Sequence, residues 1–379
     1  MPVANVYYDE FVEGLPSLEG KCIAITGTTS GTGFWCATAA VKKGAAAVLL
    51  CNRASSRATD ADAQIFAAAE GTKTAVSSVV CDLMSLDSVR SAAQEVNKIA
   101  GKHGGLDILA CNAGVMAMPD DRTVDGYDVQ MQVNHLSHFL LSALVMPSLE
   151  SAAKKRGEAR CVTHSSGARF FGLGKLPFGA TFEKCEPGTL GGNAGTLATM
   201  NFLGGQMVRY CHSKAANAVF AMALHEKLAA TGSAVKAVTC EPGLAETALF
   251  AKGFNVATEK PINPGIKAQA LKAFSCFRLM QSGPDGAMPL MQACFGADVA
   301  SGDMYCPKHQ APVPTGKGPK LLYNKGLPQK TVAAGVPVFG PKDKKEKLTC
   351  DDAAKTTLWA KSEAAVGAFT IPADPTGCL

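Results

Sequence analysis

The sequence predicts an α/β fold in which a doubly wound parallel sheet is covered by helices on both faces. Short β-rich runs alternate with helical stretches from Lys21 onward, which is the pattern of strands joined by crossover helices. The β-rich runs are almost continuously apolar, as expected for strands buried on both faces. The 379 residues are 47% hydrophobic and 18% charged, a composition that excludes a disordered chain, a collagen-like fibre or a coiled coil.

Six strands and five helices are predicted in alternation. The apolar runs place the strands at residues 22–26, 47–51, 76–81, 108–111, 160–164 and 235–240. Helical patterns fill the intervals at residues 31–43, 57–70, 86–100, 124–149 and 207–230. Strands and helices in this order favour a single domain of the Rossmann type.

Two segments interrupt the alternation. Residues 167–205 are rich in Gly, Phe and Thr without a clear period, and loops of this length are usually functional. Prolines and glycines then accumulate after Cys306, before a charge run at 342–347. We therefore expect one domain over residues 1–306 with an insert at 167–205. Residues 307–379 form a C-terminal extension, a surface tail that ends in a short helix.

The terminal helix is expected from about Asp351. Its apolar residues Leu358, Trp359 and Val366 form a stripe that could dock onto the domain.

Charge and cysteine usage narrow the class of partner and compartment. Lys and Arg number 37 against 32 Asp and Glu, a net charge of +5, which is too mild for a protein whose main partner is nucleic acid. None of the 14 cysteines stands at C-x-x-C spacing, and there is no N-x-[ST] sequon or signal peptide. We expect an intracellular, cytoplasmic protein without disulfides, with an organelle left open.

No transmembrane segment is predicted. The longest apolar stretch, 136–149, has 14 residues, whereas a spanning helix needs about 20. It is interpreted as a buried helix, and peripheral membrane contact is left open.

A glycine-rich loop, TGTTSGTG at residues 26–33, separates the first predicted strand from the first helix. Glycines let the backbone approach a pyrophosphate, whose charge is stabilised by the helix N-terminus. A turn without a ligand is the alternative, but the position between strand and helix favours dinucleotide binding. No lysine follows, so the loop is not a P-loop. The candidate binding residues are Gly27, Thr29, Ser30, Gly31 and Gly33.

Arg53 lies two residues beyond the second predicted strand, where a Rossmann fold recognises the ribose. An acid there would bind the 2′-hydroxyl of NAD, whereas an arginine pairs with the 2′-phosphate of NADP. The nearest acid is Asp60, so the sequence favours NADP(H). A solvated loop arginine is the alternative.

Tyr210 and Lys214 are four residues apart on a predicted helix and therefore share a face. A nearby ammonium favours phenolate, lowering a tyrosine pKa that starts near ~10. Such a tyrosine can exchange a proton with a carbonyl oxygen. A surface pair is the alternative reading of this spacing.

The order of the motifs resembles the short-chain dehydrogenase/reductase family. The glycine-rich loop is followed by Asn112-Ala113-Gly114, Ser165-Ser166, Tyr210/Lys214 and Pro242-Gly243, each after its predicted strand. The resemblance covers roughly residues 20–305. The segments VNHLSHF at 133–139 and YCHSK at 210–214 look most like the retinol dehydrogenase branch, with protochlorophyllide reductases more distant.

The resemblance implies a role for each matching residue. Tyr210 would be the general acid/base, and Lys214 would lower its pKa and hold the nicotinamide ribose. Ser166, with Ser165 as the fallback, would bind the substrate oxygen, and Asn134 would support a proton relay. The implied cofactor contacts are Asp82 and Leu83 at the adenine, Asn112, Ala113 and Gly114, Tyr210 and Lys214, and Pro242, Gly243 and Thr247.

Three departures from the family pattern are visible. Cys111 replaces a first asparagine, and Phe34 and Trp35 replace smaller residues after the glycine-rich loop. Ser166 and Tyr210 are 44 positions apart, because the insert lies between them, so the insert should shape the substrate pocket. We further expect no N-terminal membrane anchor, although one is common in the retinol branch, and this expectation weakens a membrane-resident retinoid role.

Other candidate sites carry less weight. His135 and His138 lack a carboxylate partner, so core histidines are favoured and no metal site is predicted. Met and Phe residues between Phe274 and Met291 recur at helical spacing, which favours core packing over a lipid groove. The 342–347 charge run is most simply a solvated tail.

The sequence therefore predicts an NADPH-dependent oxidoreductase that interconverts a carbonyl and an alcohol on an apolar small molecule by direct hydride transfer. Two alternatives stay open. One is a non-catalytic NADP-binding subunit or scaffold of a larger assembly, and the other is a double-bond reductase of a pigment-like substrate. Homo-oligomerisation is also left open.

Overall fold

An eight-stranded sheet forms the centre of the molecule. The computed structural model describes residues 4–170, 180–192, 204–245, 281–309, 324–331 and 352–372. The strand order is β3-β2-β1-β4-β5-β6-β7-β8. Neighbouring strands from β3 through to β7 pair in parallel, and β8 is antiparallel to β7. The chain runs outward from β1 to β3 and then returns to β4 on the other side of β1, so the predicted doubly wound sheet is confirmed.

All six predicted strands are present within one residue at each end. The bounds are β1 Cys22–Thr26, β2 Ala47–Asn52, β3 Ala75–Val80, β4 Ile108–Cys111, β5 Ala159–His164, β6 Val235–Cys240, β7 Met304–His309 and β8 Asn324–Thr331.

The prediction of a surface tail beyond Cys306 was wrong for the β7–β8 hairpin. Both strands contain a proline, and Pro307 faces Pro328 across the pair. β8 is the edge strand, and β7 pairs with β6 at Met304 and Tyr305, before Pro307. Proline is tolerated where one row of backbone groups needs no partner in the sheet.

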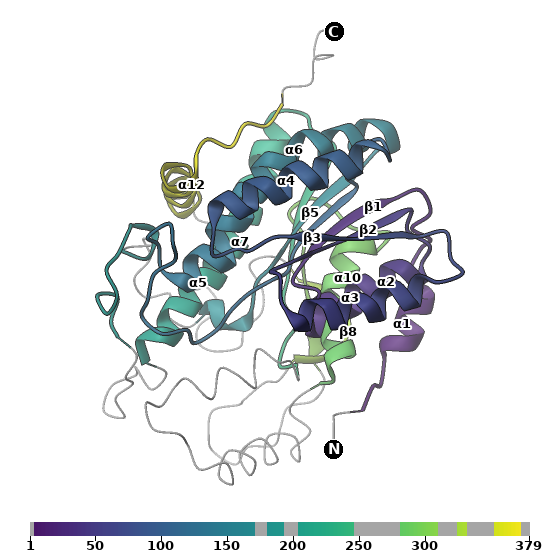
Figure 1. Cartoon of the computed structure of the whole chain (residues 1–379), viewed down its shortest axis with the longest axis horizontal. Coiled ribbons are helices and arrows are strands. Elements are labelled where there is room, and N and C mark those ends of the chain that lie inside the picture. Colours follow the sequence, from purple (N-terminus) through teal and green to yellow (C-terminus); the bar gives the residue numbers. More distant parts are fainter. Residues whose placement is uncertain are drawn as a thin grey trace.

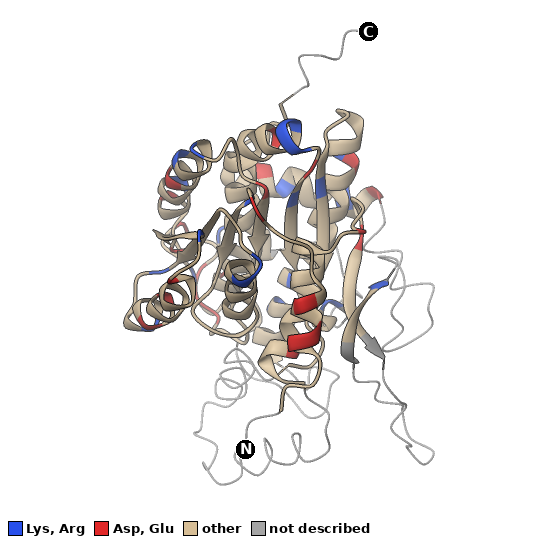
Figure 2. Cartoon of the chain, turned by 90° about the vertical axis from the view of Figure 1, so that its right-hand side faces the viewer, with Lys and Arg blue, Asp and Glu red and all other residues tan. Residues whose placement is uncertain are grey.

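Helices cover the two faces of the sheet (Figure 1). One layer contains α1 Tyr8–Gly14, α2 Gly31–Lys42, α3 Ser56–Ala69 and α10 Gly283–Phe295, and the other contains α4 Leu86–Gly101, α6 Ser137–Arg156, α7 Gly204–Ala230 and α12 Asp352–Val366. Each layer packs on its own apolar core, and alternate strand residues enter each core: Ala24 faces the α6 side while Ile23 and Ile25 face the α2 side. In Figure 2, basic and acidic residues are interspersed over the described elements.

The predicted helix at 124–149 was wrong at its start and in its regularity. Gly126 has φ +93°, which a helix cannot contain. The helix begins only after Asp128, whose side chain accepts a hydrogen bond from Met131 N at 2.8 Å. Helix α5 Val129–Met131 then passes into a π-helical turn, η1 Gln132–Leu136, before α6.

The continuous stretch Val129–Arg156 is the one helix among the described residues that is long and apolar enough to cross a membrane. Its apolar window is 72% buried, as in the core helix of a globular protein.

Helix α12 packs against α7 and confirms the predicted terminal helix. Leu358, Trp359 and Val366 are buried. The Trp359 ring lies 5.1 Å from the Phe139 ring centroid and 5.0 Å from that of Phe369. The last described part of the chain is thus joined to the core between α6 and α7.

Candidate active site

The predicted motifs meet at one edge of the sheet. Each directly follows the carboxyl end of a strand, except Tyr210 and Lys214, which lie on α7 beside β5 and β6. In a doubly wound sheet this edge forms a crevice where the strand order reverses, here between β1 and β4.

The glycine-rich loop is shaped by backbone conformations and close contacts that require glycine. Gly27 and Gly31 have φ of +74° and +62°, in the left-handed region where other residues are strained. A Cβ on Gly33 would lie 2.3 Å from the carbonyl oxygen of Gly27. The loop therefore folds tightly over the start of α2.

The N-terminus of α2 has its backbone donors available. Ser30, the N-cap, makes no side-chain capping bond, and the first turn holds no acidic residue. A helix start in this condition, reached through glycines, is suited to an anion such as a phosphate.

Asn112 ties the glycine-rich loop to the strands on either side. Its Nδ2 donates to Thr26 O at 2.8 Å, and its Oδ1 accepts from Thr32 Oγ1 at 2.8 Å. The same Oδ1 lies 2.8 Å from His164 Nδ1. Burial lowers the His164 pKa to about 3, so this imidazole is neutral and can hold the asparagine in place as a donor. Sequence reasoning found Asn112 but missed His164.

Asn52 is a second residue that sequence reasoning passed over. Its side chain accepts a hydrogen bond from Thr28 N at 2.8 Å and donates to Asp62 at 3.2 Å, so it fixes the loop from β2. Arg53 follows β2 directly and is exposed. Within the described part of the chain its guanidinium forms no ion pair, so its charge remains available to a ligand.

Asp82 and Leu83 follow β3 as predicted. The Asp82 carboxylate accepts from Met84 N at 3.0 Å. The carbonyl oxygen of Leu83 accepts from Ser137 Oγ at 2.7 Å, which connects this loop to the start of α6.

Tyr210 and Lys214 share the buried face of α7. The Lys214 Nζ lies 5.9 Å from the Tyr210 ring centroid. The Ser166 side chain is hydrogen-bonded to the Tyr210 hydroxyl, whereas Ser165 Oγ donates to Lys214 O at 2.8 Å. Of the two candidate serines, the structure thus brings Ser166 to the tyrosine.

The expected lowering of the Tyr210 pKa is corrected by the structure. Burial raises the Tyr210 pKa, and the hydrogen bond from Ser166 opposes this only in part. Burial also lowers the Lys214 pKa, to about 8. The sequence argument counted the attraction between the two charges and omitted the cost of removing each from water, which dominates here.

Lys214 donates a hydrogen bond to a backbone oxygen, and its side chain lies close to Gly114. Its Nζ donates to His164 O at 3.0 Å. A Cβ on Gly114 would lie 3.2 Å from this Nζ and 3.1 Å from Asn134 Oδ1. Gly114 therefore lets the β4 loop approach both side chains.

Asn134 lies in the η1 π-helical turn, which the sequence pattern did not predict. Its Nδ2 donates to Ser213 Oγ at 2.8 Å and to Val115 O at 2.9 Å, and its Oδ1 accepts from Val115 N at 2.8 Å. Short π-helical turns within α-helices frequently occur at functional sites. Asn134 thus connects the β4 loop to the helix that carries Tyr210.

The segment after β6 completes the edge. Gly243 has φ +65°, and Pro242 O accepts a hydrogen bond from Gln281. Thr247 lies outside the described residues. Next to Pro242, the buried Glu241 forms an ion pair with the buried Arg169, which also donates to Ser166 O at 3.1 Å. Neither charge was recognised from the sequence.

His135 belongs to the core. Its Nε2 lies 2.8 Å from Ser362 Oγ on α12, and burial lowers its pKa to about 3. Among the described residues, no three His, Cys, Asp or Glu side chains gather as a metal site would require.

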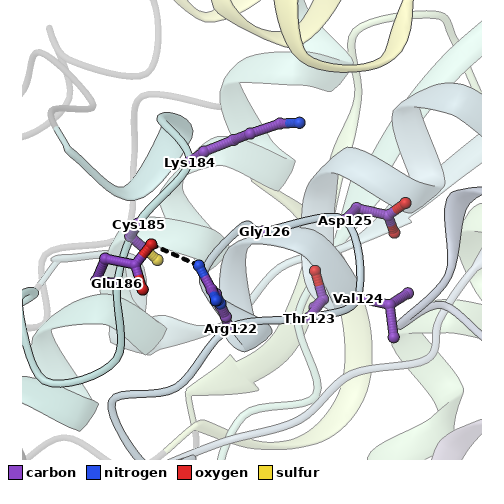
Figure 3. A pocket seen from close by; sticks show the side chains of 8 residues that line it. All are labelled: Arg122, Thr123, Val124, Asp125, Gly126, Lys184, Cys185 and Glu186. Carbon is purple, nitrogen blue, oxygen red and sulfur yellow. Dashed lines mark hydrogen bonds and ion pairs between the residues drawn. The ribbon is translucent and has the colours of Figure 1, made fainter.

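An open pocket of about 600 Å³ lies where the insert meets the loop before α5. It is lined by residues 122–126 and 184–186, and two of these residues, Arg122 and Glu186, form an ion pair (Figure 3).

The fold and the convergence of these motifs define a dinucleotide-binding α/β domain. Residues 21–178 match the family model for short chain dehydrogenases. Retinol dehydrogenase 12 of Bos taurus is 32% identical over 237 residues, which cover 62% of this chain and 65% of the relative. An uncharacterized oxidoreductase of Schizosaccharomyces pombe is 30% identical, covering 62% and 63%. Over residues 21–178 the chain is thus similar to the short chain dehydrogenases, and over 62% of its length it is similar to retinol dehydrogenase 12.

The matches extend over part of these relatives, just under two thirds of their length, and over 53% of the human WW domain-containing oxidoreductase, which is 31% identical. Solved structures agree in fold. An uncharacterized protein from Mycobacterium paratuberculosis has a TM-score of 0.59 at 24% identity, covering 95% of this chain and 98% of its own. A short chain dehydrogenase from Burkholderia cenocepacia in complex with NADP has a TM-score of 0.51 at 21% identity, covering 75% and 94%.

Proposed function

We propose that this protein is an NADP(H)-dependent oxidoreductase that interconverts a carbonyl and an alcohol on a small apolar molecule. The observation that carries the proposal is the position of Tyr210. Its hydroxyl meets the Ser166 side chain beside Lys214, at the sheet edge where the glycine-rich loop opens toward α2.

The residues at that edge fit an NADP(H) molecule. The uncapped start of α2 would hold the pyrophosphate, and Asp82 with Leu83 would border the adenine. Arg53 supplies a positive charge after β2, where a 2′-phosphate would lie. The Burkholderia relative in complex with NADP supports the same choice of cofactor.

The bound dinucleotide would supply or accept the hydride. Tyr210 would pass its hydroxyl proton to the substrate oxygen, and Ser166 would hold that oxygen by a hydrogen bond. Since burial raises the Tyr210 pKa, the residue keeps its proton at neutral pH. In this protonation state Tyr210 can act as the proton donor that reduction of a carbonyl requires.

Lys214 and Asn134 would support the tyrosine. A lysine with a pKa of about 8 is mostly charged at pH 7 and can stabilise negative charge on the Tyr210 oxygen. The amide of Asn134 is hydrogen-bonded to Ser213 and to Val115 in the β4 loop, and thereby fixes the part of the site next to Lys214.

The apolar side chains near the candidate active site bear on the substrate class. Met288 and Met291 are fully buried in the core on the α2 side, so they do not line the substrate pocket. Phe274, Phe277 and Met280 lie outside the described residues. Val115, whose backbone is hydrogen-bonded to Asn134, and Met118 in the same loop are partly buried after β4, and these apolar side chains support a small apolar substrate.

The proposal is tested by NADPH consumption with a panel of aldehydes and ketones. We expect Tyr210→Phe to lower kcat/KM by at least ~100-fold while the protein still binds NADPH, measured by nucleotide fluorescence. Tyr127→Phe is the matched control, because its hydroxyl donates to Ala365 O at 3.2 Å, on the α12 side of the domain. Unchanged carbonyl turnover by Tyr210→Phe would reject the proposed role.

A further inference from the structure

Arg209, the residue before Tyr210, has a fully buried guanidinium in an ionic network. Its Nε lies 3.1 Å from Asp128 Oδ2, and its Nη1 lies 3.8 Å from Asp120 Oδ2. All three side chains are at most 1% exposed. Burying three charged groups is costly unless the geometry is well satisfied, so these contacts call for an explanation.

The guanidinium also binds three backbone carbonyls from two separate segments. Nη1 donates to Gly192 O at 2.9 Å and Leu190 O at 3.3 Å, both in the insert. Nη2 donates to Met118 O at 3.1 Å, in the loop that follows β4. One side chain on α7 therefore holds the insert and the β4 loop together.

Asp120 holds the same insert segment from the other side. Its Oδ2 accepts from Leu190 N at 2.9 Å and from Gly192 N at 2.8 Å. The insert backbone also approaches α7 closely, because a Cβ on Gly205 would lie 2.5 Å from Gly191 O. Residues 189–192 are thus fixed by donors from Arg209 and by an acceptor from Asp120.

Each segment attached to Arg209 leads to a residue of the candidate active site. Asp128 caps the helix that continues into η1 and Asn134. The β4 loop that carries Met118 and Asp120 also contains Val115, which is hydrogen-bonded to Asn134. Arg209 itself precedes Tyr210.

We propose that Arg209, with Asp120 and Asp128, is a positioning residue that fixes insert residues 189–192 as a wall of the substrate site and thereby selects the carbonyl compounds accepted. The selection rests on the proposed function, whereas the anchoring of the insert does not. The role needs arginine, because the planar guanidinium makes several bonds in fixed directions that a lysine ammonium cannot reproduce.

The test compares Arg209→Lys with wild type by amide hydrogen exchange and by substrate selection. We expect exchange at 189–192 to become about tenfold faster, since local opening is resisted by these contacts. We also expect the ratio of kcat/KM for decanal to that for propanal to change by about tenfold, because a displaced wall alters substrate placement. NADPH affinity should stay within twofold, because among the described residues no hydrogen bond or ion pair joins the network to the glycine-rich loop.

Arg122→Ala is the matched control. Arg122 also pairs with the insert, at 2.6 Å from Glu186, but at the surface with side chains 44% and 71% exposed (Figure 3). Exposed pairs contribute little, so both readouts should stay at wild-type values. If Arg209→Lys does not fold, Asp120→Asn preserves side-chain volume and weakens the same insert contacts.

The outcomes separate the two claims. Unchanged exchange at 189–192 in a folded variant would overturn the anchoring. Faster exchange with an unchanged decanal-to-propanal ratio would overturn the role in selection. If wild-type protein turns over no carbonyl at all, the proposed function fails and the selection fails with it, while the exchange data still decide the anchoring.

Discussion

Replacing Lys214 with methionine should stabilise the fold at neutral pH, although Lys214 is a proposed active-site residue. Burial lowers the Lys214 pKa from 10.5 to about 8. The ammonium is thus less favourable in the folded state than in the unfolded chain. Methionine keeps a similar length and shape without the charge.

The magnitude follows from the two pKa values. A difference of 2.5 between 10.5 and about 8 corresponds to a cost of about 3 kcal/mol when the lysine is charged in both states, as at pH 7. The variant also loses the hydrogen bond from Nζ to His164 O, worth about 1 kcal/mol. Asn217 still donates to that carbonyl at 3.0 Å, so no buried acceptor is left without a partner. We expect Lys214→Met to be more stable than wild type by about 2 kcal/mol at pH 7.

The two pKa values also fix the direction in which stability changes with pH. The folded state releases the Lys214 proton at lower pH than the unfolded chain, so wild-type stability rises with pH between about 8 and 10.5. From pH 7 to pH 9 the advantage of Lys214→Met should therefore shrink by about 1 kcal/mol. Urea unfolding of both proteins in reducing buffer at the two pH values measures this difference, with Lys98→Met at an exposed site as control. A variant less stable than wild type by the same amount at both pH values would refute the reasoning.

Three further substitutions test the cofactor site and the C-terminal helix. Arg53→Glu should weaken NADPH binding by at least ~10-fold and leave NADH binding less affected, because the charge facing the expected 2′-phosphate is reversed; equal losses for both nucleotides would contradict the assignment. Gly33→Ala should destabilise the protein by about 1–3 kcal/mol and impair nucleotide binding, since its Cβ would lie 2.3 Å from Gly27 O; titration calorimetry and urea unfolding would report both. Trp359→Ala should cost about 3–5 kcal/mol of unfolding free energy, because the ring packs between Phe139 and Phe369, and a loss below 1 kcal/mol would show that α12 is not joined to the core as described.

The sequence predicted the sheet well because most of its strands are buried on both faces. The expectation of burial on both faces was wrong for β3, an edge strand that is largely exposed. Runs such as 47–51 and 108–111 are apolar throughout, and such runs fit few structures other than a covered strand. The β7–β8 hairpin lacked this signal, since each of its strands carries a proline and β8 also carries lysines and a glycine at the open edge. The π-helical turn at 132–136 was also missed, because it changes the hydrogen-bond pattern without a change in apolar periodicity.

The residues of the candidate site also fall into those that a local sequence pattern predicts and those that only the fold brings together. Glycine, tyrosine and lysine at fixed spacing are local patterns, so Gly27, Tyr210 and Lys214 could be found along the chain. Arg209 meets Asp120 and Asp128 from positions 89 and 81 residues away in the sequence, and no local pattern connects them. The direction of the Tyr210 pKa shift was likewise missed, because desolvation depends on the surrounding fold.

The two segments that enlarge the common fold act on the same few residues from opposite sides. The insert reaches Arg209, next to Tyr210, through the backbone at Leu190 and Gly192. The C-terminal helix reaches His135, next to Asn134, through Ser362 at 2.8 Å. Lys361 of α12 also pairs with Glu183 of the insert at 2.7 Å, so the two added segments touch each other. Since a shift of about 1 Å in a reacting group can change a rate by ~100-fold, contacts in these positions bear on how Asn134 and Tyr210 are placed, and not only on stability.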